Sequence, residues 1–327
     1  MILVTGASGF VGLYLVRALS AQGIQLRALY HNNPPQTPDA TLPGVEWQKA
    51  DLLDVYDVEA AMQKITHVYH CAAIVSFQPG DQSKMLHFNP ESTANIVNAA
   101  LAQEIEKMVY LSSVAAIGRS ASDTGKQVTE EEEWGESAYN SAYGISKYVA
   151  EMEVWRAIGE GLDAVIINPG IILGSGHWDS GSPALMKVVW NQFPFYTNGV
   201  TGWADVEDVV RIMLLCMASS ITGERYIVSA GNHSFKEIFT LMASALGKKP
   251  PTIYANSMVT GLAWRLGRLQ NLLGRQAVIT RETARNAHSL SFYNNEKLKS
   301  AFPHFSYTSI EETITKMARS FVTVHKK

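Results

Sequence analysis

The sequence predicts an α/β protein with a doubly wound parallel sheet and a smaller, mostly helical C-terminal domain that binds substrate. The first observation behind this prediction is that short β-type runs alternate with helical patterns through the first two-thirds of the 327 residues. The second is a glycine-rich turn that directly follows the first β-type run. Strands separated by helices form βαβ units, whose right-handed crossovers place helices on both faces of a parallel sheet.

The individual elements follow from the spacing of apolar residues. Val11, Leu15, Val16 and Leu19 recur at helical intervals after the glycine-rich turn. The expected helices are Phe10–Gln22, Asn89–Gln103, Ala142–Ile158 and Val206–Met217. The expected strands are Ile2–Val4, Leu26–Tyr30, His67–His70, Met108–Leu111, Ala164–Ile167 and Tyr226–Val228.

The domain organisation is predicted from where this alternation weakens. Residues 1–169 are expected to form a Rossmann-type dinucleotide-binding domain, to which 203–229 return. Residues 170–202 and 230–327 are expected to form the substrate-binding domain, because 174–202 is rich in Gly, Ser, Pro and Trp. Asn32–Pro43, with its four prolines, is interpreted as a loop and not as a linker between domains.

Composition excludes several functional classes. The net charge of −3 and the 17% of charged residues offer no basic excess for nucleic acid or an anionic membrane. Cys71 and Cys216 lie far apart, as expected in a reducing compartment, and no histidine pair has metal-ligand spacing. No apolar run reaches transmembrane length, and a strand beginning at Ile2 leaves no room for a signal peptide. We therefore expect a cytoplasmic protein without a metal site.

The run Thr5-Gly6-Ala7-Ser8-Gly9-Phe10-Val11-Gly12 has the spacing of a phosphate-binding turn between a strand and a helix. Gly6 and Gly9 let the backbone approach a pyrophosphate at the positive end of the helix dipole, and Gly12 permits close packing of helix on strand. We therefore expect a dinucleotide to contact Gly6, Ser8, Gly9, Phe10, Val11 and Gly12.

The end of the second strand bears on the choice of dinucleotide. NAD-binding proteins often place an acidic residue there to hold the ribose 2′-hydroxyl. This chain has Tyr30-His31-Asn32-Asn33, with no carboxylate to repel a 2′-phosphate, and Arg27 and His31 are nearby. The pattern favours NADP(H) slightly over NAD(H) and leaves both open.

An acid–base pair is predicted from Tyr143 and Lys147, which lie one helical turn apart and share a face. A tyrosine with its ordinary pKa near 10 exchanges protons poorly at neutral pH, and a neighbouring cation favours the phenolate. Ser113 comes just after the strand that ends at Leu111, so it can hydrogen-bond a substrate carbonyl oxygen as charge develops on it.

Together these motifs resemble the extended (atypical) short-chain dehydrogenase/reductases of the NAD-dependent epimerase/dehydratase family, in particular the dihydroflavonol-reductase-like branch. The resemblance implies that Tyr143 exchanges the proton, that Lys147 lowers its pKa and holds the nicotinamide ribose, and that Ser113 orients the substrate. Spacing to Gly118 selects Ser113 over Ser112. The resemblance also implies cofactor contacts from Asp51, Leu52, Ala72, Ala73, Asn89, Pro169 and Ile171, with Asn89 opening its helix.

Residues near these motifs and beyond them narrow the choice among the reactions of this family. Val114-Ala115 stands where related dehydratases carry an Asp-Glu pair, so dehydration is not expected. Lys187 is the single Lys or Arg between Gly170 and Ala204, whereas a nucleotide diphosphate needs Arg pairing. That stretch is instead aromatic, and about half of its rings are expected to line an apolar pocket: Trp178, Trp190, Phe193, Phe195, Tyr196 and Trp203.

We therefore expect a reductase of a ketone or aldehyde in an apolar or aromatic small molecule. A nucleotide-sugar epimerase with tightly bound NAD remains an alternative, and a non-catalytic dinucleotide sensor is a third hypothesis. Glu130–Glu133 is interpreted as a solvated loop at the mouth of the pocket. Met258–Leu273 is interpreted as an amphipathic segment that packs on the substrate domain, with contact to a membrane surface as the less favoured alternative. The resemblance also implies a homodimer through the helices at Asn89–Gln103 and Ala142–Ile158.

Overall fold

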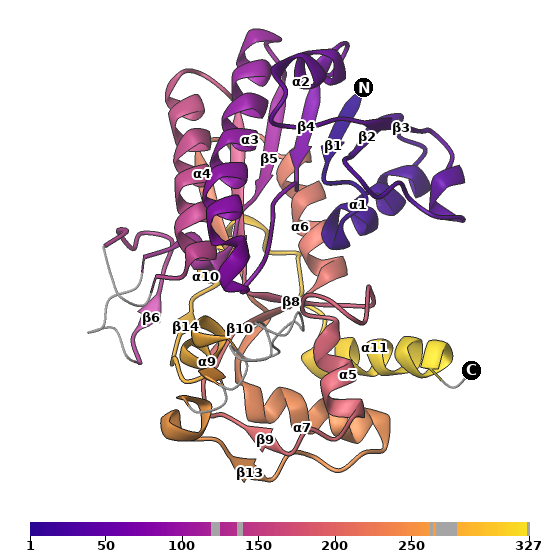
Figure 1. Cartoon of the computed structure of the whole chain (residues 1–327). Coiled ribbons are helices and arrows are strands. Elements are labelled where there is room, and N and C mark those ends of the chain that lie inside the picture. The colour runs from indigo at the N-terminus through magenta and orange to yellow at the C-terminus, as the bar shows by residue number, and fades with distance from the viewer. Residues whose placement is uncertain (119–124, 136–139, 262–263, 266–279, 326–327) are drawn as a thin grey trace.

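A seven-stranded parallel sheet forms the centre of the molecule (Figure 1). The computed structural model describes residues 1–118, 125–135, 140–261, 264–265 and 280–325. The strand order β11-β7-β5-β4-β1-β2-β3 is doubly wound about β1, and every neighbouring pair is parallel. The strands are β1 (Ile2–Thr5), β2 (Leu26–Tyr30), β3 (Val45–Lys49), β4 (His67–His70), β5 (Lys107–Leu111), β7 (Ala164–Pro169) and β11 (Glu224–Val228). The predicted α/β fold is confirmed.

Helices cover both faces of this sheet because successive strand residues point to opposite sides. On one face Val4 and Val165 pack in a core with α1 (Phe10–Ala21) and α6 (Val206–Ala218). On the other face Leu3 and Ile166 pack in a second core with three further helices. These are α2 (Val55–Met62), α3 (Gln82–Ala102) and α4 (Ala142–Gly159), and Figure 1 shows α3 and α4 side by side.

One predicted helix boundary is wrong. The helix expected to begin at Asn89 begins at Gln82, and Pro90 lies inside it. A proline has no N–H to bond to the preceding turn, so sequence reasoning favours a helix start near it. Here the turn before Pro90 stays helical, with Met85 fully buried. Asn89 therefore lies in the helix interior.

The C-terminal part packs beneath the carboxyl edge of the large sheet (Figure 1). A three-stranded sheet of β8 (Ile171–Leu173), β10 (Val200–Asp205) and β12 (Gly231–Ser234) is covered by α5 (Ala184–Trp190), α7 (Phe235–Leu246) and α11 (Ile310–His325). Their shared core contains Trp203 and Phe321. Shorter elements are β6 (Gln127–Val128), β9 (Phe195–Tyr196), β13 (Ile253–Tyr254), α9 (Arg281–Asn286), β14 (Phe292–Tyr293) and α10 (Glu296–Ala301).

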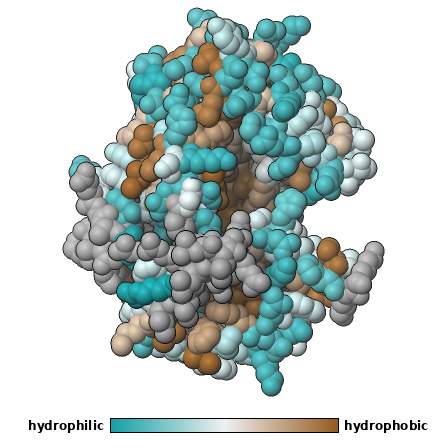
Figure 2. All heavy atoms as spheres, in the orientation of Figure 1, coloured by the Kyte–Doolittle hydropathy of each residue, from teal (hydrophilic) through white to brown (hydrophobic). Residues whose placement is uncertain are grey.

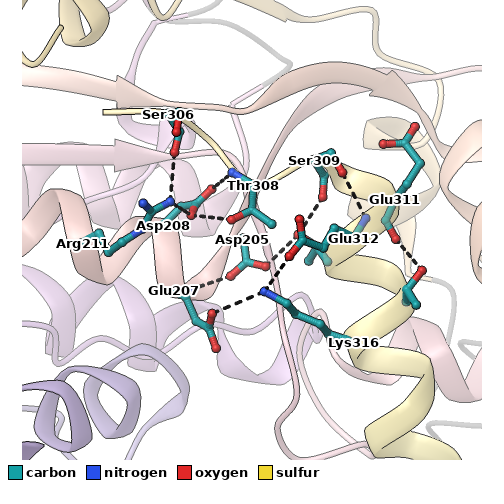
Figure 3. A network of polar contacts seen from close by, with 12 residues as sticks. Asp205, Glu207, Asp208, Arg211, Ser306, Thr308, Ser309, Glu311, Glu312 and Lys316 are labelled. Carbon is teal, nitrogen blue, oxygen red and sulfur yellow. Dashed lines mark hydrogen bonds and ion pairs between the residues drawn. The ribbon is translucent and has the colours of Figure 1, made fainter. Parts of the chain in front are cut away.

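A polar network fastens the C-terminal helix to the Rossmann part (Figure 3). Asp205 caps α6 by accepting a hydrogen bond from the Glu207 N–H at 2.7 Å, and its second oxygen accepts from Thr313 Oγ1 of α11 at 2.7 Å. Asp208 accepts from the N–H and the hydroxyl of Thr308, at 2.7 and 2.9 Å. Charge-assisted hydrogen bonds of this kind are stronger than neutral ones, so the two carboxylates hold α11 against α6.

Cys216 is fully buried, as expected, whereas Cys71 is partly exposed at the end of β4. Across the described residues no helix is both long enough and apolar enough to cross a membrane. The described residues likewise contain no His, Cys, Asp or Glu cluster that could hold a metal ion. The interpreted segment Met258–Leu273 falls largely outside the described part of the chain, and the assignment of 1–169 and 203–229 to one domain stays a prediction.

Candidate active site

The glycine-rich turn between β1 and α1 is shaped by contacts that exclude side chains. Gly6 has a φ of +61°, and a Cβ built on it would lie 2.7 Å from the Ala72 backbone. A Cβ on Gly12 would lie 2.1 Å from the Gly6 carbonyl oxygen. The Gly9 N–H donates to that same oxygen at 2.9 Å, which closes the turn directly before α1. Only glycine fits at positions 6 and 12, so the turn is built for close backbone approach.

The N-terminus of α1 fits the pyrophosphate of a dinucleotide. Gly9 occupies the cap position and is exposed, no side-chain hydrogen bond caps the helix, and its first turn holds no acid. Ser8, Phe10 and Val11 surround this end, where the backbone N–H groups and the helix dipole favour an anion. The loop after β8 lies close by, because Tyr14 donates to the Ser175 carbonyl at 2.9 Å.

The residues expected near the adenine ribose come after β2 and β3. His31 Nε2 lies 3.7 Å from Asp51 Oδ2, and both side chains are about half exposed. Leu52 is buried beside them. Arg27 does not contribute to this group, because it pairs with Glu46 at 3.0 Å and donates to carbonyls at the end of α2. Of the two basic groups considered for a 2′-phosphate, His31 alone lies at the carboxyl edge of the sheet.

The segment after β4 is held in place by hydrogen bonds with side chains of β1 and α3. The Ala72 N–H donates to Thr5 Oγ1 at 3.2 Å, which places Ala72 and Ala73 beside the glycine-rich turn. The Asn89 side chain accepts from the Ile74 N–H at 2.7 Å and donates to the Ile74 carbonyl at 3.0 Å. Asn89 is buried, so these contacts shape this loop, and its expected cofactor contact stays a prediction.

Ser113 and Tyr143 are brought together by a close approach of α4 to the short 3₁₀ turn Val114–Ala116. A Cβ on Gly144 would lie 2.8 Å from the Ala115 carbonyl oxygen, so glycine at this position permits the approach. Ser113 caps the turn, accepting from the Ala115 N–H at 3.1 Å. Burial raises the pKa of Tyr143, and its hydrogen bond with Ser113 offsets part of that increase.

Lys147 lies one turn along α4 and is almost completely buried. Its Nζ donates to Tyr110 Oη and to the Leu111 carbonyl, both at 2.8 Å. Burial lowers the pKa of Lys147 to about 7, against a smaller increase from Glu151. The expected lowering of the Tyr143 pKa by Lys147 is not found in this arrangement, because the ammonium is held by β5 and burial dominates the tyrosine.

A buried carboxylate lies one further turn along α4. Glu151 is fully buried and accepts hydrogen bonds from Ser112 Oγ at 2.5 Å and from Asn168 Nδ2 at 2.8 Å. Its other oxygen pairs with Arg225 of β11 at 3.2 Å. Asn168 Nδ2 also donates to the Ser113 carbonyl at 3.0 Å. Glu151 therefore links the end of β5, the end of β7 and the edge strand β11, and the end of β7 holds Pro169, directly before Gly170 and Ile171.

The acidic run Glu130–Glu133 is a loop, as expected, and Glu131 and Glu133 are exposed, but Glu130 is not solvated. Glu130 is buried, and its carboxylate accepts from the Ile227 N–H at 2.8 Å along the edge of β11. Arg225 donates to the backbone carbonyls of Glu130 and Glu132, at 2.6 and 3.0 Å. A carboxylate that replaces a missing sheet partner is stabilised by such bonds, so Glu130 closes the end of the sheet.

Half of the six aromatic residues between 178 and 203 pack in the core of the C-terminal part, as expected. Trp178 and Trp190 pack against Phe321 of α11, with ring centroids 5.1 and 5.6 Å apart, and Trp203 is fully buried. The remaining rings lie at or beside the short strand β9, and they are Phe193, Phe195 and Tyr196. An aromatic ring beside the predicted catalytic tyrosine comes from elsewhere: Phe77 meets Tyr143 edge-on at 6.0 Å.

Sequence reasoning overlooked several side chains that support the site. Tyr110 on β5 accepts a hydrogen bond from Lys147, and Glu151 on α4 accepts hydrogen bonds from Ser112 and Asn168, yet each lies in a run that is typical of an ordinary strand or helix. The one available signal was the interval of four residues between Lys147 and Glu151, which places both on one helix face. Phe77 belongs to no sequence motif, so nothing in the sequence indicated its place beside Tyr143.

The fold and the site define a class of protein, namely dinucleotide-dependent enzymes with a Ser, Tyr and Lys group at the carboxyl edge of a Rossmann sheet. Residues 2–229 match the model of the NAD dependent epimerase/dehydratase family. The chain belongs to this family and is an enzyme of the extended short-chain dehydrogenase/reductase type.

Relatives of known description include reductases. The chain is 34% identical over 256 residues to a putative dihydroflavonol 4-reductase from Synechocystis, covering 76% of this chain and 73% of the relative. It is 28% identical over 303 residues to sterol demethylase protein B from Methylococcus capsulatus, covering 90% and 88%. Cinnamoyl-CoA reductase 1 from Petunia hybrida is 27% identical over 241 residues, covering 69% and 72%.

Solved structures agree with the fold over the whole chain. The crystal structure of gox2253 has a TM-score of 0.83 at 28% identity, covering 99% of this chain and 98% of the other. The enzyme WbmG of Bordetella bronchiseptica, in complex with NAD and UDP, has a TM-score of 0.77 at 19% identity, covering 99% and 95%. At that identity the second likeness concerns the fold alone.

Proposed function

We propose that this chain reduces a ketone or aldehyde of an apolar or aromatic small molecule, with NADP(H) as cofactor and Tyr143 as proton donor. The observation that carries the proposal is the contact between Ser113 and Tyr143 at the carboxyl edge of the sheet. Lys147 lies one turn further along the same helix. In a doubly wound sheet this edge is where ligands bind, and the glycine-rich turn at β1 opens on the same edge.

The cofactor, when bound at the N-terminus of α1, supplies hydride chemistry. The protein's own residues then manage the substrate oxygen. Ser113 donates a hydrogen bond to the carbonyl oxygen, and Tyr143 transfers its phenolic proton to that oxygen to give the alcohol. The raised pKa of Tyr143 keeps this proton in place at neutral pH, which suits a proton donor.

The proposed substrate class rests on what surrounds the tyrosine. Phe77 contacts the Tyr143 ring and Val75 lies two residues before it, and their side chains are 36% and 59% exposed. Figure 2 shows hydrophobic atoms at the bottom of a hollow near the middle of the molecule. Lys187, the single Lys or Arg between Gly170 and Ala204, forms an ion pair with Asp179. An apolar carbonyl compound suits such surroundings better than a nucleotide diphosphate.

The preference for NADP(H) rests on the exposed His31 at the end of β2 and on the lack of an acidic residue in Tyr30-His31-Asn32-Asn33. The Asp51 carboxylate, 3.7 Å from His31 Nε2, counts against it and in favour of NAD(H). We also propose a homodimer through α3 and α4. Leu86, Ile145 and Val149 are exposed on these two helices, and apolar side chains of this kind favour association of two copies.

The first experiment identifies the dinucleotide that denaturation releases from the purified protein, by mass spectrometry with stoichiometry. Little retained cofactor, with reversible NADPH binding, is expected for a reductase that exchanges its cofactor at each turnover. Near-stoichiometric NAD would overturn the proposal in favour of an epimerase, whose internal redox cycle never requires cofactor release. Failure to retain or bind either dinucleotide would refute both.

The second experiment follows NADPH oxidation with a panel of apolar ketones and aldehydes. Tyr143→Phe is expected to abolish turnover while NADPH affinity stays nearly unchanged, because a phenyl ring has no proton to give. Tyr148→Phe is the matched control on the same helix, since its ring stacks on Trp134 at 4.2 Å, away from Ser113. Equal activity of Tyr143→Phe and Tyr148→Phe would show that Tyr143 is not the proton donor.

A further inference from the structure

A chain of buried polar side chains runs behind Lys147, and the proposed mechanism does not use it. It joins Thr5, His70, Thr93 and Tyr110 to the lysine, and no member is more than 1% exposed. These residues come from β1, β4, α3, β5 and α4, so five elements that are distant in sequence meet here. Burying polar groups is costly unless each one is hydrogen-bonded.

The contacts form one continuous series. Thr5 Oγ1 lies 2.6 Å from His70 Nδ1, and His70 Nε2 lies 3.0 Å from Thr93 Oγ1. Thr93 hydrogen-bonds the Tyr110 hydroxyl, and Lys147 Nζ donates to Tyr110 Oη at 2.8 Å. The His70 and Tyr110 rings are also stacked, with centroids 5.4 Å apart. The series therefore starts one residue before the glycine-rich turn and ends at the lysine of the proposed active site.

Counting donors fixes the direction of every bond. The Lys147 ammonium can only donate, so Tyr110 Oη must accept and its own proton must point to Thr93. Thr93 gives its proton to the Asn89 carbonyl at 2.8 Å, which leaves its two lone pairs for Tyr110 and His70. His70 then carries its proton on Nε2 and accepts from Thr5 on Nδ1. This assignment needs a neutral imidazole, and burial lowers the pKa of His70 to about 3.

We propose that Tyr110 is a positioning residue for Lys147, and that Thr93 and His70 hold its hydroxyl in the accepting orientation. With Tyr110 and the Leu111 carbonyl as acceptors, two of the three ammonium N–H groups are fixed. The tetrahedral geometry of the ammonium then sets the direction of the third N–H group, so the ammonium does not have to rotate to present it. The inference rests on the proposed function together with the role that the family resemblance implies for Lys147, which is to hold the nicotinamide ribose.

The charge on Lys147 depends on all the groups that face it. Glu151 on α4 favours the ammonium, burial disfavours it, and the neutral Tyr110 supplies a hydrogen-bond acceptor. Cys71 after β4 is a neutral thiol, because burial raises its pKa to about 12. His70 is neutral, and Tyr143 lies one turn earlier with its pKa raised. Removing the Tyr110 hydroxyl takes an acceptor from a buried cation, so the pKa of Lys147 should fall below its present value of about 7.

The test measures the dissociation constant of NADPH, by fluorescence, between pH 5.5 and 9 and without a carbonyl substrate. In the wild-type protein, binding is expected to weaken as pH rises through the pKa of Lys147. In Tyr110→Phe this inflection should move down by about 0.7 pH unit, and affinity at the alkaline end should fall roughly fivefold, as expected for one lost hydrogen bond. Near pH 5.5 Lys147 is protonated in both proteins, so the loss of affinity in Tyr110→Phe should be smaller there than at the alkaline end.

Tyr69→Phe is the matched control, because it removes a buried hydroxyl from neighbouring β4 on the opposite face of the sheet. Thr93→Val should shift the inflection in the same direction by less, and it serves as the test if Tyr110→Phe fails to fold. A Tyr110→Phe or Thr93→Val profile that superimposes on the wild type would overturn the inference, as would a wild-type profile without an inflection. Absence of any NADPH or NADH binding would instead refute the proposed function.

Discussion

Replacing the buried Glu151 by glutamine tests how much the support beneath the site contributes to stability. The carboxylate is fully buried and has four hydrogen-bond donors around it. One oxygen receives Ser112 Oγ at 2.5 Å and Asn168 Nδ2 at 2.8 Å; the other receives Trp155 Nε1 at 3.3 Å and Arg225 at 3.2 Å. Glu151→Gln keeps the shape of the side chain and removes its charge.

The magnitude depends on where the new amide group must point. If its NH₂ faces Trp155 and Arg225, donors meet donors on that side. If it faces the other side, Ser112 can reverse its hydroxyl but Asn168 Nδ2 cannot. Either way Arg225 loses its counter-charge, and breaking a buried ion pair costs about 3–5 kcal/mol. Because Arg225 keeps two backbone carbonyls and is 15% exposed, we expect the low end, about 3 kcal/mol.

The assay is equilibrium unfolding in urea followed by far-UV circular dichroism. Glu153→Gln is the control on the same helix, because Glu153 pairs with Arg156 at the surface, where both side chains are about a third exposed. An exposed pair contributes about 0.5 kcal/mol or less. If the two variants shift the urea midpoint equally, with unchanged slopes, the reasoning about the buried carboxylate is wrong.

Two further changes test the buried imidazole and the C-terminal attachment. In the folded protein the pKa of His70 is lowered to about 3, whereas in the unfolded chain this histidine has its ordinary pKa of about 6.5. Between these two values only the unfolded chain takes up the proton, so stability should fall as pH drops from about 6.5 toward 3. Near pH 4.5 this loss is about 3 kcal/mol, and urea unfolding of His70→Asn should show a shallower pH dependence than the wild type; equal slopes would refute it. Asp208→Ala removes the acceptor of both Thr308 donors and should cost about 2 kcal/mol. Amide hydrogen exchange should then be faster at the start of α11 than in the exposed control Glu311→Ala, and identical exchange in the two would contradict the role of Figure 3's network.

The large sheet was predictable where strand patterns are local and apolar, and not where a strand is half exposed. Val45–Lys49 forms β3 at the sheet edge, with Glu46 and Lys49 exposed, so its sequence lacks the apolar run that marks a buried strand. The start of α3 was expected at Asn89, because the family resemblance implies that this asparagine opens its helix, whereas the helix begins at Gln82. In both places, packing against neighbours decides the structure, and a local pattern does not record it.

The site likewise has parts that the sequence predicts and parts that it does not. The glycine-rich turn and the Tyr143/Lys147 pair are contiguous motifs, so their geometry is determined within one turn or one helix. Trp178 and Trp190 show the opposite case, because their partner Phe321 is supplied by the last helix of the chain. A tryptophan that lines a pocket and one that fills a core have the same sequence signature, and only the tertiary contact separates them.

The two buried networks have a joint consequence for the charge of Lys147. Within the described part of the chain Glu151 pairs with Arg225, and no carboxylate lies within 4.0 Å of the Lys147 ammonium. Had Glu151 paired with the lysine one turn away, a salt bridge would have neutralised the charge that the proposed mechanism needs. The Glu151 carboxylate is held by Arg225, Ser112 and Asn168, whereas the Lys147 ammonium is held by the neutral Tyr110. Glu151 therefore favours the ammonium at longer range without occupying its N–H groups, which leaves one of them to act on a bound dinucleotide.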